Sequence, residues 1–337
     1  MSDPISSTSA DGPSSADSLL SVLDLKMHFP VREGILLRTG AYNRAVDGVS
    51  CSISAGETLG LVGESGCGKS TLGRCIVRLY DITEGEIQFE GISISRIKGK
   101  ALLPYRQQIQ MIFQDPMESL NSRHTVGDIL EEPFVVQNLG DSPWRRKRVA
   151  ELLDIVGLPA RSTTRYPFEF SGGQRQRIGI ARSIATNPKL VVCDEPVSAL
   201  DVSIQSQILN LLIDLQQEFS LSYLFIAHDL AVVKHISDRI AIMYLGKIVE
   251  NGDSDEIYRN PRHPYTRSLI SAIPIPDPHR RSKRQVLEGD VPSPINPPSG
   301  CSFHPRCPHV KDSCKHDEPP LRNLDDAHSI ACHFDLD

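Results

Sequence analysis

Apolar and polar residues alternate along the first part of the chain, in the manner of strands that bury one face. Residues 19–29 and 45–54 follow this pattern. Residues 84–95 predict a hairpin that turns near Glu90-Gly91. The first part of the chain is therefore expected to be mainly β-structure.

Farther along, strand patterns alternate with helical ones. Apolar runs at 57–62 and 109–113 fit buried strands, and helical spacing is clear at 146–158 and 206–219. Further strand patterns lie at 190–193, 223–227 and 239–252. Strands that alternate with helices indicate an α/β core around a largely parallel sheet.

Changes in composition divide the chain into three parts. Residues 1–18 are rich in Ser, Asp, Pro and Gly and are expected to form a disordered tail. Residues 19–263 carry the α/β pattern, with a mainly helical stretch at about 115–177. Residues 264–337 are rich in proline, have few apolar runs and carry four cysteines, so a small irregular extension is expected. No internal repeat occurs in the sequence, which indicates one core domain.

The composition is that of an ordinary globular protein, with 39% hydrophobic and 23% charged residues. The formal net charge of −6 argues against a nucleic-acid partner. The basic runs at 144–148 and 279–284 are expected to be a solvated helix face and an exposed linker. No apolar run approaches the ~18 residues of a membrane span, and the start lacks the features of a secretory signal. A cytosolic location is expected, so the eight cysteines are thiols or metal ligands rather than disulfides.

A phosphate-binding motif follows the strand predicted at 57–62. The residues that match G-x-x-x-x-G-K-[ST], together with the next residue, are Gly63, Glu64, Ser65, Gly66, Cys67, Gly68, Lys69, Ser70 and Thr71. The glycines let backbone N–H groups approach phosphate oxygens at the positive end of the following helix. Lys69 adds a charge for the β- and γ-phosphates, and the Ser70 hydroxyl suits Mg²⁺. The motif therefore predicts a site for ATP with Mg²⁺.

Cys67 lies inside this loop and admits two roles. It is either a small spacer or a thiol whose pKa is depressed at a helix N-terminus. The spacer role is favoured, and the reactive role would require ATP to shield Cys67 from alkylation.

Two carboxylates end the strand predicted at 190–193. Asp194 suits a contact with Mg²⁺, and Glu195 suits the polarising of the water that attacks the γ-phosphate. Two acids at a strand end are, by themselves, equally compatible with a solvated terminus. A motif about 20 residues upstream decides in favour of the functional interpretation.

That motif consists of Ser171, Gly172, Gly173 and Gln174. Ser171 is a good N-cap, and the two glycines expose N–H groups at a helix start, which makes a second phosphate site. Together with the phosphate loop and the acidic strand end, the motif resembles the signature of the ABC ATPases, with Phe170 in place of the usual leucine. The resemblance implies a head-to-tail dimer with ATP between the phosphate loop of one subunit and the signature of the other.

Further residues match ABC ATPase motifs in the order of the family. Gln114 matches the Q-loop, Asp201 the D-loop that communicates across the dimer, and His228 the switch histidine that contacts the γ-phosphate. The resemblance implies catalytic roles for Glu195, His228 and Gln114, and Mg²⁺ contacts for Ser70, Gln114 and Asp194. It also implies a P-loop α/β core with an antiparallel β subdomain and a helical subdomain.

One departure from the family concerns the adenine base. The family stacks adenine on an aromatic residue just before the strand that starts at Ala45. That position is Arg44 here, with Tyr42 two residues earlier. Either Arg44 stacks through its guanidinium plane or Tyr42 takes this role.

The sequence favours a transport ATPase over soluble ABC proteins. A chromosome-maintenance ATPase would carry a long coiled coil between Lys69 and Ser171, and a translation factor would carry two nucleotide domains. The sequence has neither feature. Segments similar to the oligopeptide/dipeptide importer ATPases, and to the second of the two ATPases that such systems often encode, are 29–50, 63–79, 114–133, 169–212 and 262–269.

This resemblance implies partners and a location. The partners are a second, related ATPase in a heterodimer, two membrane permeases and an extracytoplasmic peptide-binding protein. The helical region from Gln114 to about Arg175 would contact the permeases at the cytoplasmic face of the membrane. The expected solute is a dipeptide or oligopeptide, and nickel or another small solute is the alternative.

Four cysteines lie close together near the end of the chain: Cys301, Cys307, Cys314 and Cys332. Some peptide importer ATPases carry a 4Fe-4S cluster on four such cysteines, so the resemblance favours a cluster. Zinc is the alternative, with further ligands available from His304, His309, His316, His328 and His333. Plain buried thiols are the third option. An extension with few apolar residues is expected to need a cross-link to fold, which favours a metal.

Overall fold

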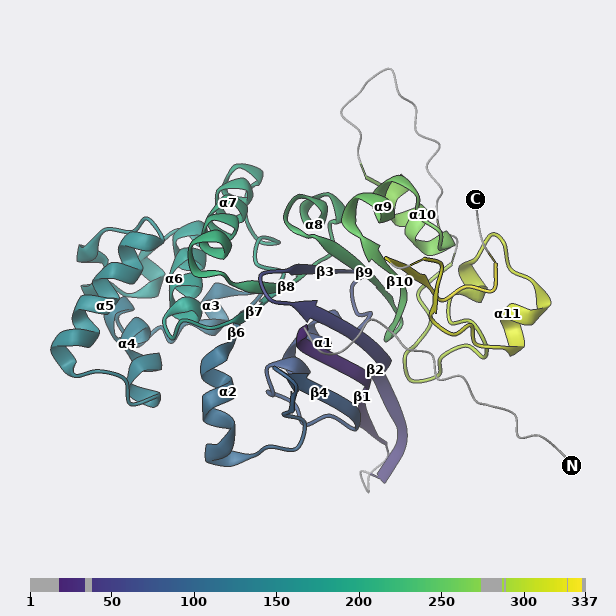
Figure 1. Ribbon diagram of the computed structural model, residues 1–337, viewed down its shortest axis with the longest axis horizontal. Helices are drawn as coiled ribbons and strands as arrows, with labels where there is room; N and C mark the ends of the chain where they lie inside the picture. The colour runs from purple at the N-terminus through teal and green to yellow at the C-terminus, as the bar shows by residue number, and fades with distance from the viewer. Residues whose placement is uncertain (1–17, 34–37, 274–286, 288, 326, 335–337) are drawn as a thin grey trace, which may run out of the picture.

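The structure is a computed structural model that describes residues 18–33, 38–273, 287, 289–325 and 327–334. A central sheet carries a helical lobe at one end and the C-terminal extension at the other (Figure 1). A second sheet lies beneath the first. Residues 1–17 of the predicted disordered tail and the basic run at 279–284 lie outside the described residues.

The central sheet has eight strands in the order β11-β12-β10-β9-β3-β8-β7-β6. Strands β6, β7, β8, β3 and β9 run parallel, and β10, β12 and β11 continue the sheet in antiparallel fashion. The bounds are β3 Thr58–Val62, β6 Ile109–Ile112, β7 Leu190–Asp194, β8 Ser222–Ala227, β9 Arg239–Tyr244, β10 Lys247–Asp253, β11 Arg322–Asn323 and β12 His328–Ile330. The predicted α/β core with a largely parallel sheet is confirmed.

The parallel strands are buried on both faces, which explains their short unbroken apolar runs. Within β8, Tyr223 and Phe225 pack into one core, and Leu224 and Ile226 pack into the other. The first core lies against α6, α7 and α8, and the second holds α1 between the two sheets. The helices of this body are α1 Lys69–Ile76, α2 Leu103–Gln108, α7 Val202–Phe219, α8 Leu230–Ile236, α9 Ser254–Arg259 and α10 Pro264–Ser271.

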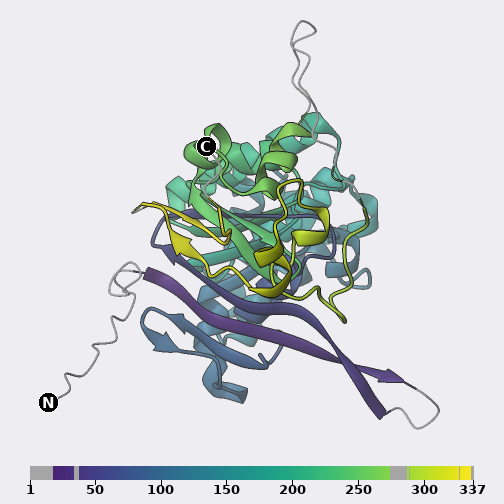
Figure 2. The same cartoon turned by 90° about the vertical axis from the view of Figure 1, so that its right-hand side faces the viewer.

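The second sheet is four-stranded and antiparallel, in the order β2-β1-β4-β5. Its strands are β1 Ser18–Glu33, β2 Arg38–Ser54, β4 Glu84–Phe89 and β5 Ile92–Ser93. The predicted turn between β4 and β5 is confirmed, since Glu90 and Gly91 both have positive φ, 50° and 75°. Strands β1 and β2 extend beyond the predicted 19–29 and 45–54 as a long two-stranded ribbon (Figure 2).

The stretch predicted to be helical forms the lobe at one end of the molecule (Figure 1). Its helices are α3 Pro116–Ser119, α4 Val126–Val136, α5 Ser142–Ile155 and α6 Gly172–Ile184, with 3₁₀ turns at Ala160–Thr164 and Pro167–Glu169. Thr125 and Asp128 form a capping box that starts α4. None of the helices in the described part of the chain has the length and apolar character of a membrane span.

The C-terminal extension is joined to the body by strands and by a buried core. Strand β12 pairs with β10, and short helix α11 Asp312–His316 lies at the outer end (Figure 1). Phe303 is buried in an aromatic cluster with Tyr244 and Tyr265, at centroid distances of 5.3 and 5.4 Å. The extension thus draws part of its hydrophobic core from the rest of the described chain rather than forming one alone.

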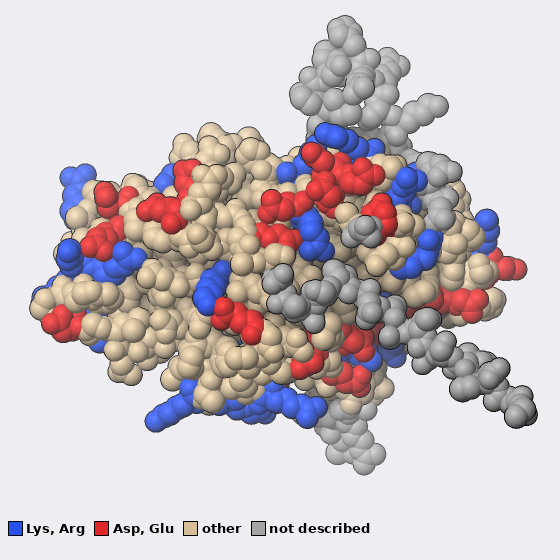
Figure 3. Space-filling model, viewed as in Figure 1, with Lys and Arg blue, Asp and Glu red and all other residues tan. Residues whose placement is uncertain are grey.

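Charges of both signs are interspersed over most of the face in Figure 3, and a row of Lys and Arg lies along its lower edge. The electrostatic field of this face is therefore mixed in sign.

A buried polar network fixes α10 to β10 and β12. The Glu250 carboxylate accepts hydrogen bonds from the backbone N–H groups of Arg262 and His263, at 2.7 and 3.0 Å, and lies 2.8 Å from His328 Nε2. His263 Nδ1 accepts from the N–H of Tyr265 at 3.1 Å and caps α10. Because His263 is buried, its pKa is lowered from 6.5 to about 4.

This lowered pKa predicts a loss of stability in mild acid. The unfolded chain binds a proton at His263 below pH 6.5, whereas the folded chain binds it only near pH 4, so unfolding becomes easier as pH falls between these values. The loss should approach about 3 kcal/mol of unfolding free energy. Urea unfolding at pH 6.5 and at pH 4 measures this loss. We expect the fall in unfolding free energy to be smaller by about 3 kcal/mol in His263→Asn, which keeps a good N-cap, than in the wild type. Parallel losses in the two proteins would contradict the assignment.

Candidate nucleotide site

The predicted phosphate loop connects the end of β3 to the start of α1, as the motif requires. Two of its glycines are enforced by close backbone contacts. A Cβ on Gly63 would lie 2.1 Å from the carbonyl oxygen of Met243, and one on Gly68 would lie 2.0 Å from that of Ala45. Gly68 also has a φ of +108°, which favours glycine. The loop is therefore packed tightly against the backbone of both β2 and β9.

The Lys69 side chain is buried and folds back over the loop. Its ammonium donates hydrogen bonds to the carbonyl oxygens of Gly63 and Glu64 at 2.8 and 3.1 Å. These partners hold the positive charge within the curve of the loop. A charge held in such a loop is suited to bind a phosphate group.

A cavity of about 530 Å³ opens over the loop and α1. Its lining includes nine of the predicted site residues: Ser65, Gly66, Gly68, Lys69, Ser70, Thr71, Gln114, Glu195 and His228. The other lining residues are Phe29, Asn43, Ala45 and Pro294. The ends of parallel strands and the start of a helix thus meet at one cavity, the usual place for a ligand in an α/β sheet.

Glu195 lies at the centre of three strand ends. Gln114 Nε2, after β6, donates to Glu195 Oε2 at 3.0 Å, and His228 Nδ1, after β8, lies 3.5 Å from the same oxygen. Glu195 has a φ of +46°, an uncommon conformation for a residue with a side chain. The structure therefore brings together the three residues that the sequence nominated as catalytic.

Asp194 is buried beside the first turn of α1. The Ser70 hydroxyl donates to Asp194 Oδ1 at 2.7 Å, and Arg74 Nη2 lies 4.0 Å from Oδ2. Burial raises the pKa of Asp194. Among the described residues, none forms a hydrogen bond with Asp194 Oδ2. Ser70 lines the cavity, whereas Asp194 is buried and is not among the described lining residues. A hydroxyl and an incompletely partnered carboxyl group beside it supply the oxygen ligands that Mg²⁺ takes.

Cys67 points into the protein rather than into the cavity. It is 2% exposed, and burial raises the pKa of its thiol although Lys69 opposes this effect. A Cβ on Gly63 would lie 2.7 Å from Cys67 Sγ, so the thiol fills a tight space. These observations favour the spacer role.

The two residues predicted to contact adenine lie on β2, next to residues of the cavity wall. Among the described residues that line the cavity, neither Tyr42 nor Arg44 is present. Alternation along β2 directs Asn43 and Ala45 into the cavity instead. Phe29 of β1, paired with Asn43, contributes the aromatic ring. Sequence reasoning missed it, although an aromatic residue at the end of an alternating strand was a usable signal.

The signature residues form the predicted helix start, but away from the cavity. Ser171 Oγ accepts from the N–H of Gln174 at 3.4 Å, and Gln174 Oε1 accepts from the N–H of Ser171 at 3.1 Å. None of Ser171, Gly172, Gly173 or Gln174 is among the described residues that line the cavity. Asp201 is exposed at the start of α7. A single chain therefore does not bring its signature to its own phosphate loop.

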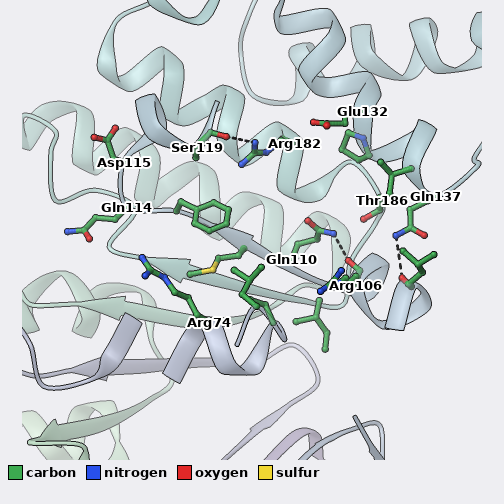
Figure 4. A pocket seen from close by; sticks show the side chains of 18 residues that line it. Arg74, Arg106, Gln110, Gln114, Asp115, Ser119, Glu132, Gln137, Arg182 and Thr186 are labelled. Atoms are coloured by element: carbon green, nitrogen blue, oxygen red, sulfur yellow. Dashed lines mark hydrogen bonds between the residues drawn. The ribbon is translucent and has the colours of Figure 1, made fainter. Parts of the chain in front are cut away.

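A second, larger cavity of about 740 Å³ lies between the sheet and the helical lobe. Figure 4 shows Gln114 and Asp115 at one end and Glu132 and Gln137 toward the other. Arg182 spans this space and donates to the carbonyl oxygen of Ser119 at 2.6 Å. Gln114 belongs to both cavities, so it connects the nucleotide site to this groove.

The prediction of a 4Fe-4S cluster on Cys301, Cys307, Cys314 and Cys332 is wrong. In the part of the chain that the structure describes, no group of three or more His, Cys, Asp or Glu side chains is arranged to hold a metal ion, which also removes support for zinc. Burial raises the pKa of Cys301 to about 11 and raises those of Cys307 and Cys332, which disfavours thiolates. The premise that the extension needs a metal fails because Phe303 and β12 attach it to the body.

Solved structures resemble the body of the chain. A dimeric post-hydrolysis state of the ATP-binding cassette MJ0796 with ADP and phosphate has a TM-score of 0.62 and 28% identity, and the match covers 70% of this chain and 98% of that one. The cbiO1 protein of Clostridium perfringens, part of the ABC transporter complex cbiONQ, has a TM-score of 0.62 and 27% identity. That match covers 72% of this chain and 92% of cbiO1. Fold and site define the chain as an ATPase of the ATP-binding cassette class.

Sequence comparisons narrow this class. Residues 46–198 match the ABC transporter family, and residues 249–314 match the oligopeptide/dipeptide transporter C-terminal region. The oligopeptide transport ATP-binding protein AppF of Bacillus subtilis is 52% identical over 321 residues, covering 94% of this chain and 98% of AppF. A probable peptide ABC transporter ATP-binding protein of Sinorhizobium fredii is 50% identical, and the match covers 94% of this chain and 90% of that protein. The chain belongs to the ABC transporter ATP-binding proteins, in the group with the oligopeptide/dipeptide C-terminal region.

The burial of Cys67 predicts that it resists alkylation whether or not ATP is present, because its thiol is enclosed and mostly protonated at neutral pH. We expect mass spectrometry after iodoacetamide treatment to find Cys67 unmodified in both samples and modified in a denatured control. Rapid modification that ATP prevents would instead support a reactive thiol.

Proposed function

We propose that the protein is the ATP-hydrolysing subunit of an ABC importer for dipeptides or oligopeptides. The observation that carries the proposal is the Glu195 carboxylate, which contacts Gln114 and His228 beside the loop that carries Lys69. The names of the relatives and the match of the C-terminal region support peptides as the solute.

In this proposal each residue of the cavity has its own role in phosphoryl transfer. Glu195 orients and polarises the attacking water, and His228 and Gln114 contact the γ-phosphate and hold that carboxylate in place. Lys69 and the N–H groups of the loop bind the β- and γ-phosphates. Ser70, Gln114 and Asp194 would hold Mg²⁺, which would neutralise part of the phosphate charge.

Phe29 takes the role of the aromatic contact to adenine. It is half-buried in the cavity wall, and its ring is fixed edge-to-face against Tyr80 at 5.5 Å. A base that lies over Phe29 would have its phosphates directed toward the loop residues of the same cavity. A fixed aromatic ring costs little entropy on binding.

The protein acts as part of a head-to-tail dimer in which Ser171, Gly172, Gly173 and Gln174 bind the ATP of the other subunit. The absence of these residues from the described cavity lining supports this arrangement. The partner we propose is a second, related ATPase, with Asp201 at the contact between the two. The similar MJ0796 cassette, which is dimeric in its ADP- and phosphate-bound structure, adds support.

The protein works with membrane permeases at the cytoplasmic face of the membrane, and a peptide-binding protein delivers the solute on the other side. We propose the groove between the sheet and helical lobe as the permease contact. Gln114 lines both this groove and the nucleotide cavity, so a contact in one affects the other.

The role of Glu195 predicts a separation of binding from turnover. Glu195→Gln keeps the shape of the side chain and its contact with Gln114 but removes the base, so kcat should fall by about 10²- to 10³-fold with ATP affinity kept. Titration with ATP and phosphate release at saturating ATP measure the two effects. Glu84→Gln, which changes an exposed carboxylate on β4, is the matched control. Unchanged turnover in Glu195→Gln would refute the assignment.

The same variant tests the solute. In cells that carry the partner genes, we expect uptake of a radiolabelled dipeptide to require the wild-type protein and to be lost with Glu195→Gln. Uptake of labelled nickel, without uptake of peptide, would contradict peptide import.

The adenine contact predicts that Phe29→Ala raises the Kd for ATP by about 5- to 150-fold, since stacking of a base on an aromatic ring contributes about 1–3 kcal/mol. Turnover at saturating ATP should change little. Tyr42→Ala is the control, because Tyr42 is 54% exposed and absent from the described cavity lining. A larger effect from Tyr42→Ala than from Phe29→Ala would reverse the assignment.

A further inference from the structure

Two segments of the C-terminal extension reach the nucleotide site of their own chain, one at the cavity and one at the phosphate loop. Pro294 lines the cavity, and its carbonyl oxygen accepts a hydrogen bond from the N–H of Arg44 on β2 at 3.1 Å. Arg306 forms an ion pair with Glu64, the second residue of the phosphate loop. Pro294 thus lies in the cavity wall, whereas neither Arg306 nor Glu64 is among the described residues that line the cavity.

The pair between Arg306 and Glu64 is bidentate. Arg306 Nη1 donates to Glu64 Oε2 at 2.7 Å, and Nη2 donates to Oε1 at 3.1 Å. The Arg306 side chain is only 7% exposed and that of Glu64 is 28% exposed. A parallel, two-bond pair that is shielded from water is stronger and more directional than an exposed salt bridge.

Glu64 is held through all three of its polar groups. Its N–H donates to the Tyr265 hydroxyl at 2.9 Å, its carbonyl oxygen accepts from Lys69 Nζ at 3.1 Å, and its carboxylate accepts from Arg306. The carbonyl that helps to hold the Lys69 ammonium therefore belongs to a residue whose side chain is fixed by the extension.

Arg306 is itself held in place by the buried core of the extension. It ends the 3₁₀ turn His304–Arg306, directly after Phe303. Phe303 packs on Tyr244 and Tyr265, and the Arg306 guanidinium lies 5.9 Å from the Tyr244 ring. The aromatic cluster thus fixes both groups that reach Glu64, namely Arg306 and the Tyr265 hydroxyl.

The charge of Glu64 gives this pair a function. A free carboxylate on the loop would repel a triphosphate, whose binding depends on a positive field at the helix start. We propose that Arg306 is a positioning residue for nucleotide binding, which neutralises Glu64 and fixes the phosphate loop from outside the cavity lining. The C-terminal extension is, in this view, a structural part of the nucleotide site of its own subunit. This inference rests on the ATPase function proposed above.

The test compares single and double variants of the full chain. Arg306→Gln leaves Glu64 without its guanidinium partner, so we expect the Kd for ATP to rise about 10-fold while kcat at saturating ATP stays within about twofold. Adding Glu64→Gln removes the carboxylate, and affinity should return to within about threefold of the wild type. Lys315→Gln, which changes an exposed residue of the extension that pairs with Asp312, is the matched control and should bind as the wild type does.

Each result has one meaning. Wild-type affinity for ATP in Arg306→Gln overturns the proposal. A double variant that binds ATP as weakly as Arg306→Gln also overturns it, because Glu64→Gln would not rescue the loss of a purely structural role. Should Arg306→Gln not fold, the double variant decides, since it leaves no unpaired carboxylate: it must bind ATP within about threefold of the wild type. A wild-type protein that neither binds nor hydrolyses ATP would refute the proposed function itself, a result distinct from any of these.

Discussion

The phosphate loop touches backbone on two sides, and the rest of the site depends on this close fit. Gly63 approaches the carbonyl of Met243 on β9, and Gly68 approaches that of Ala45 on β2, where no Cβ fits. The N–H of Gly246, in the turn after β9, donates to the carbonyl of Cys67 at 2.9 Å. Because these contacts come from both sheets, the loop takes its shape only when the parallel core and the antiparallel sheet are packed together.

The fold was predictable where local pattern and tertiary burial agree. The hairpin turn at Glu90-Gly91 and the short apolar parallel strands are of this kind. The far half of the β1–β2 ribbon was not predictable, because pairs such as Val31 with Ala41 are held by backbone hydrogen bonds without a buried face to impose alternation. Strands β11 and β12 are too short to carry a period-two signal of their own.

Some residues of the site were likewise predictable from the sequence, and others were not. Residues in compact motifs, such as Lys69 at the start of α1 and Glu195 at the end of β7, were identified because the chemistry needs them next to strand ends in a fixed order. Phe29 and Arg306 come from segments far from the loop, Arg306 being 242 residues from its partner Glu64, so only the packed chain associates them. The metal prediction erred for a related reason. It weighed the four cysteines as a set and did not foresee that Phe303, between two of them, joins the core of the body.

The charges of the cavity bear on the dimer proposed above. Among the described residues that line the cavity, Lys69 is the one Lys or Arg side chain, and Glu195 contributes an opposing carboxylate. A triphosphate would therefore meet little net charge from side chains and would depend on the N–H groups of the loop, on Mg²⁺ and on a further helix start. Ser171 caps the start of α6 and is not among the described residues that line its own cavity, so it has the right chemistry to supply that helix start to a second subunit. Because the side chains of the cavity contribute so little net charge, the charge of an unpaired Glu64 would lower the affinity for ATP. The contact of the extension with the loop, through Arg306, neutralises that charge.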